Sequence, residues 1–156
     1  MEPVFYEGFL EEEASVRFSD FTEGGWLEHS KCLMYFERSR FRISELSGID
    51  TILTAQNQDN PPVFVVTKVE IDYLKPVRIV EGDFSRKLVV RTRLVEPVIS
   101  KLQFEHRLLD ASSGDLLIRA MIDTAVLVRG RMLLHFSQEV QECLTKYLNL
   151  AKGGKI

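Results

Sequence analysis

The sequence predicts an α+β fold in which an antiparallel sheet wraps around one long helix. Two observations carry this prediction. Residues recur at helical spacing from about Ser30 to Leu46, and the period then changes to two in four successive segments between residues 63 and 128. A helix with one apolar stripe and a sheet with one apolar face must both cover those surfaces, and packing the sheet around the helix covers both. We expect one domain over residues 1–156.

Two helices are expected, one central and one closing. The central helix has a single stripe at spacings of four and three, formed by Cys32, Phe36, Ser39, Ile43 and Leu46. Gly48 is expected to end it. The last segment, SQEVQECLTKYLNLAKGG, is expected to form a closing helix with Ser137 as its N-cap. Glu139 lies in the first turn, where a negative charge is favourable.

Four segments alternate apolar and polar residues, so each is expected to be a strand with one side facing water. They cover residues 63–74, 86–95, 100–110 and 115–128. Because short turns such as Ser112–Asp115 separate them, we expect the strands to follow one another in an antiparallel sheet.

Three further segments complete this interpretation of the chain. EASVRF, residues 13–18, is a short strand candidate, and AQNQDNPP, residues 55–62, is expected to be a loop. His106 is in register with the apolar residues Leu102, Phe104 and Leu108, which predicts a buried core histidine.

Composition argues against several classes of protein. No apolar run approaches the ~18 residues needed to cross a bilayer, and the N-terminus is acidic where a secretory signal would be basic, so we expect a cytoplasmic protein. Cys32 and Cys143 have neither CxxC spacing nor clustered histidines, so we expect no disulfide framework, no metal site and no cofactor. The mildly basic residues 75–131 suit a ligand with a few phosphates better than a nucleic acid.

Several motifs of this chain occur together in one known family. They are Asp20, Gly25, His29, MYFERSR at 34–40, and FVVTKVEIDYLKPVRIVEGD at 64–83, which ends at Asp83. With these motifs the chain resembles the hot-dog fold thioesterases of the 4-hydroxybenzoyl-CoA thioesterase class, particularly the small acyl-CoA thioesterases associated with Tol-Pal operons. The resemblance covers nearly the whole chain. It implies a hot-dog fold, which is an antiparallel β-sheet wrapped around a long central helix, here with a C-terminal helix.

The resemblance implies hydrolysis of acyl thioesters. In the family, backbone N–H groups at the start of the central helix polarise the carbonyl, since unpaired donors and the helix dipole favour developing negative charge. The working carboxylate of the family is the second Asp of an Asp-x-Asp motif, and this chain has Thr22 there. His29, Glu23 and Asp20 are the candidate catalytic residues in its place. An imidazole, with an ordinary pKa of about 6.5, suits a general base. Glu23 is adjacent to the changed position, and Asp20 alternatively tethers the loop.

The same loop supplies the candidate substrate-binding residues Thr22, Gly25 and Trp26. Trp26 is expected to form a wall of the acyl pocket or to pack against the sheet edge or a second subunit. The resemblance further implies a homodimer or homotetramer with the pocket between subunits, and acyl-CoA or acyl-carrier protein as substrate. The alternative is a non-catalytic module that binds or scaffolds acyl thioesters and has lost the catalytic carboxylate.

Overall fold

The computed structural model describes residues 2–78 and 86–153. Asp83, the last residue of the second family motif, lies outside the described residues. In chain order the elements are β1 (Val4–Tyr6), β2 (Phe9–Glu13), the 3₁₀ turn η1 (Phe18–Asp20), α1 (His29–Ser47), α2 (Ile49–Gln56), β3 (Val63–Tyr73), β4 (Leu88–Leu94), β5 (Lys101–Asp110), β6 (Leu116–Val128), β7 (Arg131–Met132) and α3 (Gln138–Ala151).

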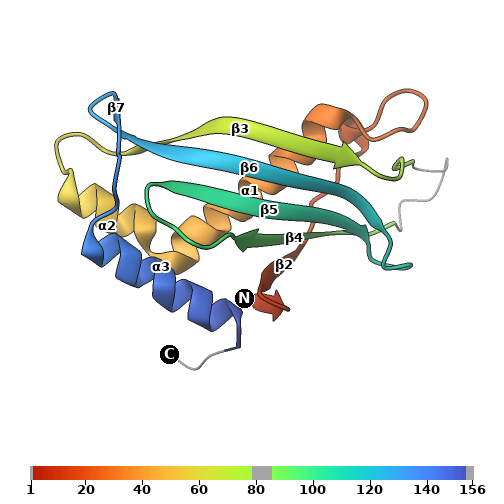
Figure 1. Ribbon diagram of the computed structural model, residues 1–156. Coiled ribbons are helices and arrows are strands. Elements are labelled where there is room, and N and C mark those ends of the chain that lie inside the picture. Colours follow the sequence, from red (N-terminus) through yellow and green to blue (C-terminus); the bar gives the residue numbers. More distant parts are fainter. Residues whose placement is uncertain (1, 79–85, 154–156) are drawn as a thin grey trace.

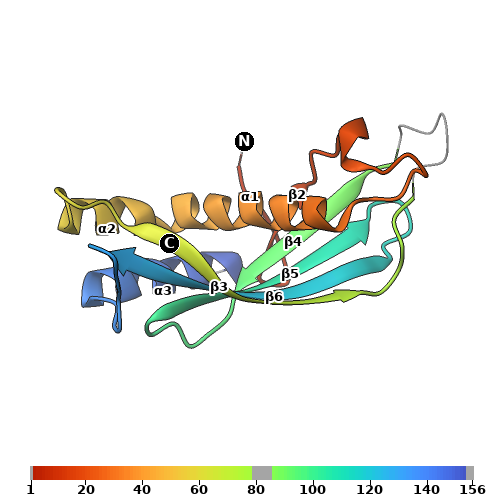
Figure 2. The same cartoon turned by 90° about the horizontal axis from the view of Figure 1, so that it is seen from above.

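The strands form one antiparallel sheet, and α1 lies along one of its faces (Figures 1 and 2). The order in the sheet is β1-β2-β4-β5-β6-β3, with β7 paired to β6. The helices α2 and α3 pack on each other and on the C-terminal half of α1. The predicted α+β architecture, with a long central helix and a C-terminal helix, is confirmed.

The helix α1 is held by the apolar stripe that its sequence predicts. Cys32, Phe36 and Ile43 are buried on it, and Gly48 ends the helix with a φ of 77°, a left-handed conformation that glycine adopts without steric cost. Two apolar clusters lie along α1, one between its N-terminal half and the sheet and the other among its C-terminal half, α2 and α3. At the closing helix, the backbone N–H of Val140 donates to Oγ of Ser137, so the predicted N-cap is confirmed.

The N-terminal strands differ from the prediction. Residues 14–17 are not in a strand; β1 and β2 form a hairpin before them instead. Glu7 and Gly8 both have positive φ at the turn, as a tight hairpin requires, and the hairpin buries Phe9 and Leu10. The segment Ile49–Gln56, at whose end a loop was expected, forms α2, because Ile49 and Leu53, one turn apart, both enter the core.

The position of β3 also differs from the prediction that the four long strands follow one another in the sheet. It pairs with β6 at the edge of the sheet rather than with β4, the next long strand in the chain. A β-bulge between Val66 and Lys68 changes the alternation, so Phe64 and Val66 face the same side as Val69 and Tyr73. Because β3 is an edge strand, most of its side chains are exposed on both faces.

The other long strands keep their predicted faces. Leu88, Val90 and Leu94 of β4 are buried on the helix side, and His106 of β5 is fully buried as predicted. The opposite side carries charge pairs across strands, such as Arg93 with Glu105. Within the described residues, no helix is long and apolar enough to cross a membrane.

Candidate functional site

The loop before α1 is a small hairpin. Phe21 and Leu27 form an isolated antiparallel bridge, and the Thr22 N–H donates to the Trp26 carbonyl at 2.7 Å. The Trp26 N–H donates to Oγ1 of Thr22 at 3.2 Å. Gly25 closes the turn with a φ of 78°, where a side chain would be strained. Thr22 therefore has a local structural role in shaping the loop.

The hairpin is joined on its other side to the chain that follows β3. The Leu27 N–H donates to the Val77 carbonyl at 2.9 Å, and Trp26 bridges to Arg78. Arg78 Nε donates to the Gly24 carbonyl at 3.3 Å, and its guanidinium carbon lies 5.2 Å from the centre of the Trp26 ring. These contacts fix the loop to the segment that follows β3, in addition to its covalent connection to α1.

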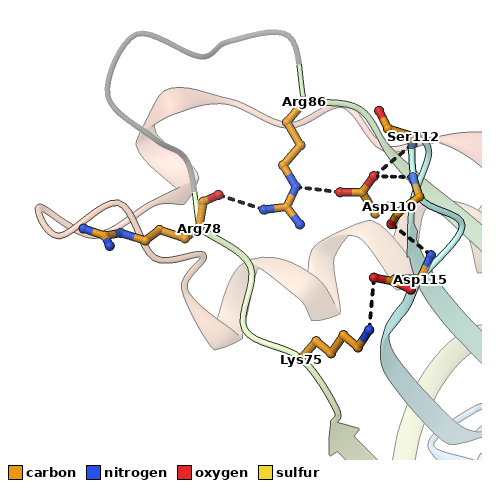
Figure 3. Close-up of polar contacts among 7 residues, drawn as sticks. Lys75, Arg78, Arg86, Asp110, Ser112 and Asp115 are labelled. Atoms are coloured by element: carbon orange, nitrogen blue, oxygen red, sulfur yellow. Dashed lines mark hydrogen bonds and ion pairs between the residues drawn. The ribbon is translucent and has the colours of Figure 1, made fainter.

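Basic side chains gather beside this loop, where the chain from β3 meets the β5–β6 turn (Figure 3). Arg86 is paired with Asp110 at 2.9 Å and donates to the Arg78 carbonyl at 2.7 Å, while Lys75 is paired with Asp115 at 3.0 Å. In Figure 3 the guanidinium of Arg78 points away from these two acids. Its positive charge lies over Trp26 instead.

Asp20 connects the loop to the central helix. It is buried, and its Oδ2 accepts hydrogen bonds from the Arg17 N–H at 2.8 Å and from the Tyr35 hydroxyl at 2.6 Å. Its backbone carbonyl accepts from the Glu28 N–H at 2.9 Å. Burial alone would raise the pKa of Asp20, but the hydrogen bonds from Tyr35 and Arg17 lower it below its ordinary value. These bonds fix where α1 begins.

We expect Asp20 to stabilise the fold near neutral pH and to lose that effect in acid. Because its folded-state pKa is lowered, the contribution is present above the unfolded-state pKa of about 3.9 and disappears as the pH falls through the folded value. Thermal unfolding of the natural protein and of Asp20→Asn, from neutral pH down to about pH 3, measures this. The gap between their midpoints should narrow in acid, and a gap that is constant with pH would contradict the assignment.

The first turn of α1 has two unpartnered backbone donors. The N-cap residue Glu28 has an extended backbone, with φ −69° and ψ 137°, and no side chain caps the helix. The Lys31 N–H donates to the Glu28 carbonyl at 3.1 Å, whereas the N–H groups of His29 and Ser30 have no hydrogen-bond partner among the described residues. Free donors at a helix start favour a negatively charged group.

A cleft of about 520 Å³ lies at this helix start. That volume falls in the range of about 300–1,000 Å³ common for small-molecule sites. The His29 ring meets the Tyr73 ring edge to face, with centroids 4.5 Å apart. The lining is mainly apolar, with a few polar groups, and consists of Thr22, Trp26, Leu27, Glu28, His29, Ser30, Cys32, Tyr73, Lys75, Pro76, Val77 and Ile118.

A second groove, of about 650 Å³, lies farther along α1 and is bordered by residues 12–15 at the end of β2. Charged side chains such as Glu12, Arg38 and Arg42 line much of it. It is larger than the cleft at the helix start, but small-molecule sites are lined mainly by apolar side chains, so we place the candidate site at the helix start.

No family model and no curated protein matches the sequence. Solved structures do match. A thioesterase from Thermus thermophilus, complexed with coenzyme A and Zn, aligns at 23% identity over 97% of this chain and 100% of its own, with a TM-score of 0.71. YbaW, a probable thioesterase from Escherichia coli, aligns at 19% identity over 88% and 98%, with a TM-score of 0.72. A probable thioesterase from Bartonella henselae aligns at 24% identity over 83% and 99%, with a TM-score of 0.67.

These alignments span nearly the full length of each neighbour. This chain has the hot-dog fold. At these identities the likeness establishes the architecture, while the chemistry has to be argued from the residues of this chain.

Within the hot-dog fold, the structure brings together three of the six residues predicted for the site. Thr22, Trp26 and His29 line the cleft. Gly25 forms the turn of the hairpin, and Asp20 is buried behind it in hydrogen bonds to Arg17 and Tyr35. Glu23 is exposed and is not part of the cleft lining.

Sequence reasoning missed Glu28. This residue precedes α1 and is the one carboxylate among the described residues that line the cleft. Its position directly before His29 was the sequence signal for it, whereas the family motif has its carboxylate at position 22. Tyr73 and Ile118 were also missed as cleft residues, because the pairing of β3 with β6 brings them there. Within residues 2–78 and 86–153, no group of three His, Cys, Asp or Glu side chains is placed to hold a metal ion.

Proposed function

We propose that this protein hydrolyses acyl-CoA thioesters in the cleft at the start of α1. The observation that carries the proposal is the pair of free N–H groups of His29 and Ser30 beside an apolar cleft. Such a pair supports binding of a thioester carbonyl, whose oxygen becomes negatively charged when water attacks. The shared fold with a thioesterase complexed with coenzyme A adds support.

The reaction needs one activated water. Water attacks the carbonyl carbon, the oxygen develops negative charge against the N–H groups of His29 and Ser30, and the C–S bond then breaks. The proton taken from the water is returned to the departing sulfur, so the products are a carboxylic acid and free coenzyme A thiol. Removing one donor from such a site typically lowers the rate about 10²–10³-fold.

We assign the positioning of that water to His29 or Glu28. Both line the cleft at the start of α1, next to the proposed carbonyl site. Glu23 and Asp20 stay predictions for this role. Glu23 is on the exposed loop and would have to turn inward to reach the cleft, and Asp20 is already bonded to Tyr35 and Arg17.

Positive charge beside the cleft favours a phosphate-bearing substrate. Arg78 lies against Trp26 with its guanidinium directed away from the neighbouring acids (Figure 3), and Lys75, although paired with Asp115, lines the cleft. Arginine and lysine bind phosphate oxygens well. This arrangement supports coenzyme A as the carrier, while an acyl-carrier-protein substrate and a cytoplasmic location stay predictions.

The test is a panel of acyl-CoA substrates assayed by release of free thiol. We expect turnover of at least one acyl-CoA, and a loss of about 10²–10⁴-fold in Glu28→Gln or His29→Ala, whichever residue acts as the base. Glu142→Gln is the matched control, because it removes an exposed carboxylate on α3, outside the cleft lining. Tight binding without thiol release would favour the non-catalytic binding module, and full activity in both Glu28→Gln and His29→Ala would overturn the assignment of the water.

We also propose that the protein works as a homodimer or homotetramer. Among the described residues, β3 is the last strand of the sheet, and its helix-facing side exposes Val66, Val69 and Tyr73. Leu33 and Phe41 of α1 are exposed as well. An open strand edge with apolar neighbours favours pairing with another chain. Sedimentation at micromolar concentration should give at least the dimer mass, and a monomer would contradict this proposal.

A further inference from the structure

Arg40 of α1 carries a positive charge into the interior of the domain. The residue is 9% exposed, and among the described residues its one hydrogen bond joins Nη1 to Nε2 of His106 at 3.4 Å. No carboxylate of the described chain lies within ion-pair distance of it. A buried guanidinium without an adjacent negative charge is strongly unfavourable, so we expect an anion to bind beside Arg40.

His106 does not supply that negative charge. It is fully buried, and burial together with the adjacent Arg40 charge lowers the pKa of His106 well below its ordinary value, which keeps the ring neutral. Since Nε2 accepts from Arg40, Nδ1 carries the ring proton and donates to Oγ1 of Thr92 at 2.8 Å. The neutral ring fixes the position of Arg40 but adds no negative charge. The carboxylate of Glu37 acts on Arg40 from an exposed position beyond ion-pair distance, so it offsets the charge only in part.

A second unsatisfied group lines the same space. Arg40 borders a cavity of about 50 Å³ between α1 and the sheet, and Thr124 of β6 borders it too. Thr124 is 5% exposed, and its buried Oγ1 has no hydrogen-bond partner among the described residues. A buried cation and a buried free hydroxyl thus meet at one cavity. One water occupies about 30 Å³ in the liquid, so the cavity has room for a group of a few atoms.

We propose that this cavity binds a carboxylate, held by the guanidinium of Arg40 and the hydroxyl of Thr124. A carboxylate has two oxygens, which match the paired N–H donors of arginine and leave lone pairs for a hydroxyl donor. Its source is either a free monocarboxylate, such as formate, or the carboxyl group at the far end of an acyl chain. Arg40 follows His29 by eleven positions on α1, about 16 Å along the helix axis, so only a long acyl group would reach both.

Glu37 lies at the edge of this cavity, and its charge should weaken carboxylate binding there. It lines the same cavity one turn before Arg40, but its side chain is exposed and does not pair with Arg40 in the structure. Its negative charge opposes a second carboxylate. Glu37→Gln should therefore strengthen carboxylate binding, whereas Arg38→Gln, an exposed charge on the same helix, should leave it unchanged.

Thermal unfolding in sodium formate, against sodium chloride at the same ionic strength, tests the site. At formate about ten times its Kd, the folding equilibrium shifts about 11-fold towards the native state, which raises the midpoint by roughly 3–6 °C for a chain of this size. Thr124→Val, which keeps the side-chain shape, and Arg40→Met should each abolish most of the shift. Equal midpoints of the natural protein in formate and chloride, or a formate shift that both variants retain, would overturn the proposal.

A second experiment identifies the source of the carboxylate and rests on the proposed thioesterase activity. If the acyl chain supplies it, a long acyl-CoA ending in a carboxyl group should have a lower KM than the plain acyl-CoA of equal length, and Thr124→Val should remove that difference. Equal KM values together with a formate shift assign the site to a free anion. Absence of any thiol release counts against the proposed function alone, because the formate shift does not depend on turnover.

Discussion

Replacing His29 with proline should lower thioester turnover about 10²–10³-fold below that of His29→Ala. Both variants lack the imidazole, so the difference between them reports the backbone N–H that proline removes. Proline suits this position because His29 is the first residue of α1. The preceding residue, Glu28, already has the extended backbone that a residue before proline prefers.

The measurement is kcat of both variants with the acyl-CoA that the natural protein turns over fastest. Circular dichroism and thermal midpoints of the two variants should agree, since the N–H of His29 has no partner to lose among the described residues. Equal kcat values would mean that this N–H does not touch the carbonyl oxygen. Ser30 would then be the remaining free donor of the first turn.

Phe36→Ala should have the largest effect on stability. Phe36 is 0% exposed, and its ring stacks on His106 with centroids 4.7 Å apart. Truncating a buried phenylalanine lowers the free energy of unfolding by about 3–5 kcal/mol, because apolar contacts are lost and a cavity is left behind. This is a large part of the about 5–15 kcal/mol that stabilises a typical domain.

Equilibrium unfolding in urea measures the effect as a lower midpoint with an unchanged slope. Leu134→Ala is the control, because Leu134 is 72% exposed and its truncation should change stability by no more than about 0.5 kcal/mol. A loss of less than about 1 kcal/mol in Phe36→Ala would show that the core refills the space.

Local periodicity predicted most of the fold because most elements bury one continuous face. The stripe of α1, with Phe36 and Ile43, and the alternation of β4 and β5 match their burial in the structure. The order of strands could not be predicted in this way. The choice of β6 rather than β4 as the partner of β3 depends on contacts between residues far apart in the sequence, and periodicity does not report such contacts.

The candidate site was predictable only where it is local. Thr22, Trp26 and His29 come from one short segment, and all three line the cleft. Tyr73 and Ile118 complete it from two paired strands, so their place depended on the strand order. Glu28 was not predicted, because its place beside the cleft depends on the exact residue at which the helix begins.

Trp26 gives the protein an intrinsic optical reporter of its cleft. It is the one tryptophan in the sequence, it lines the cleft, and it is 44% exposed beneath the guanidinium of Arg78. Indole fluorescence responds to the polarity of its surroundings and to nearby charge. Filling the cleft, or drawing Arg78 onto a phosphate, would change the emission of a single fluorophore without any added label.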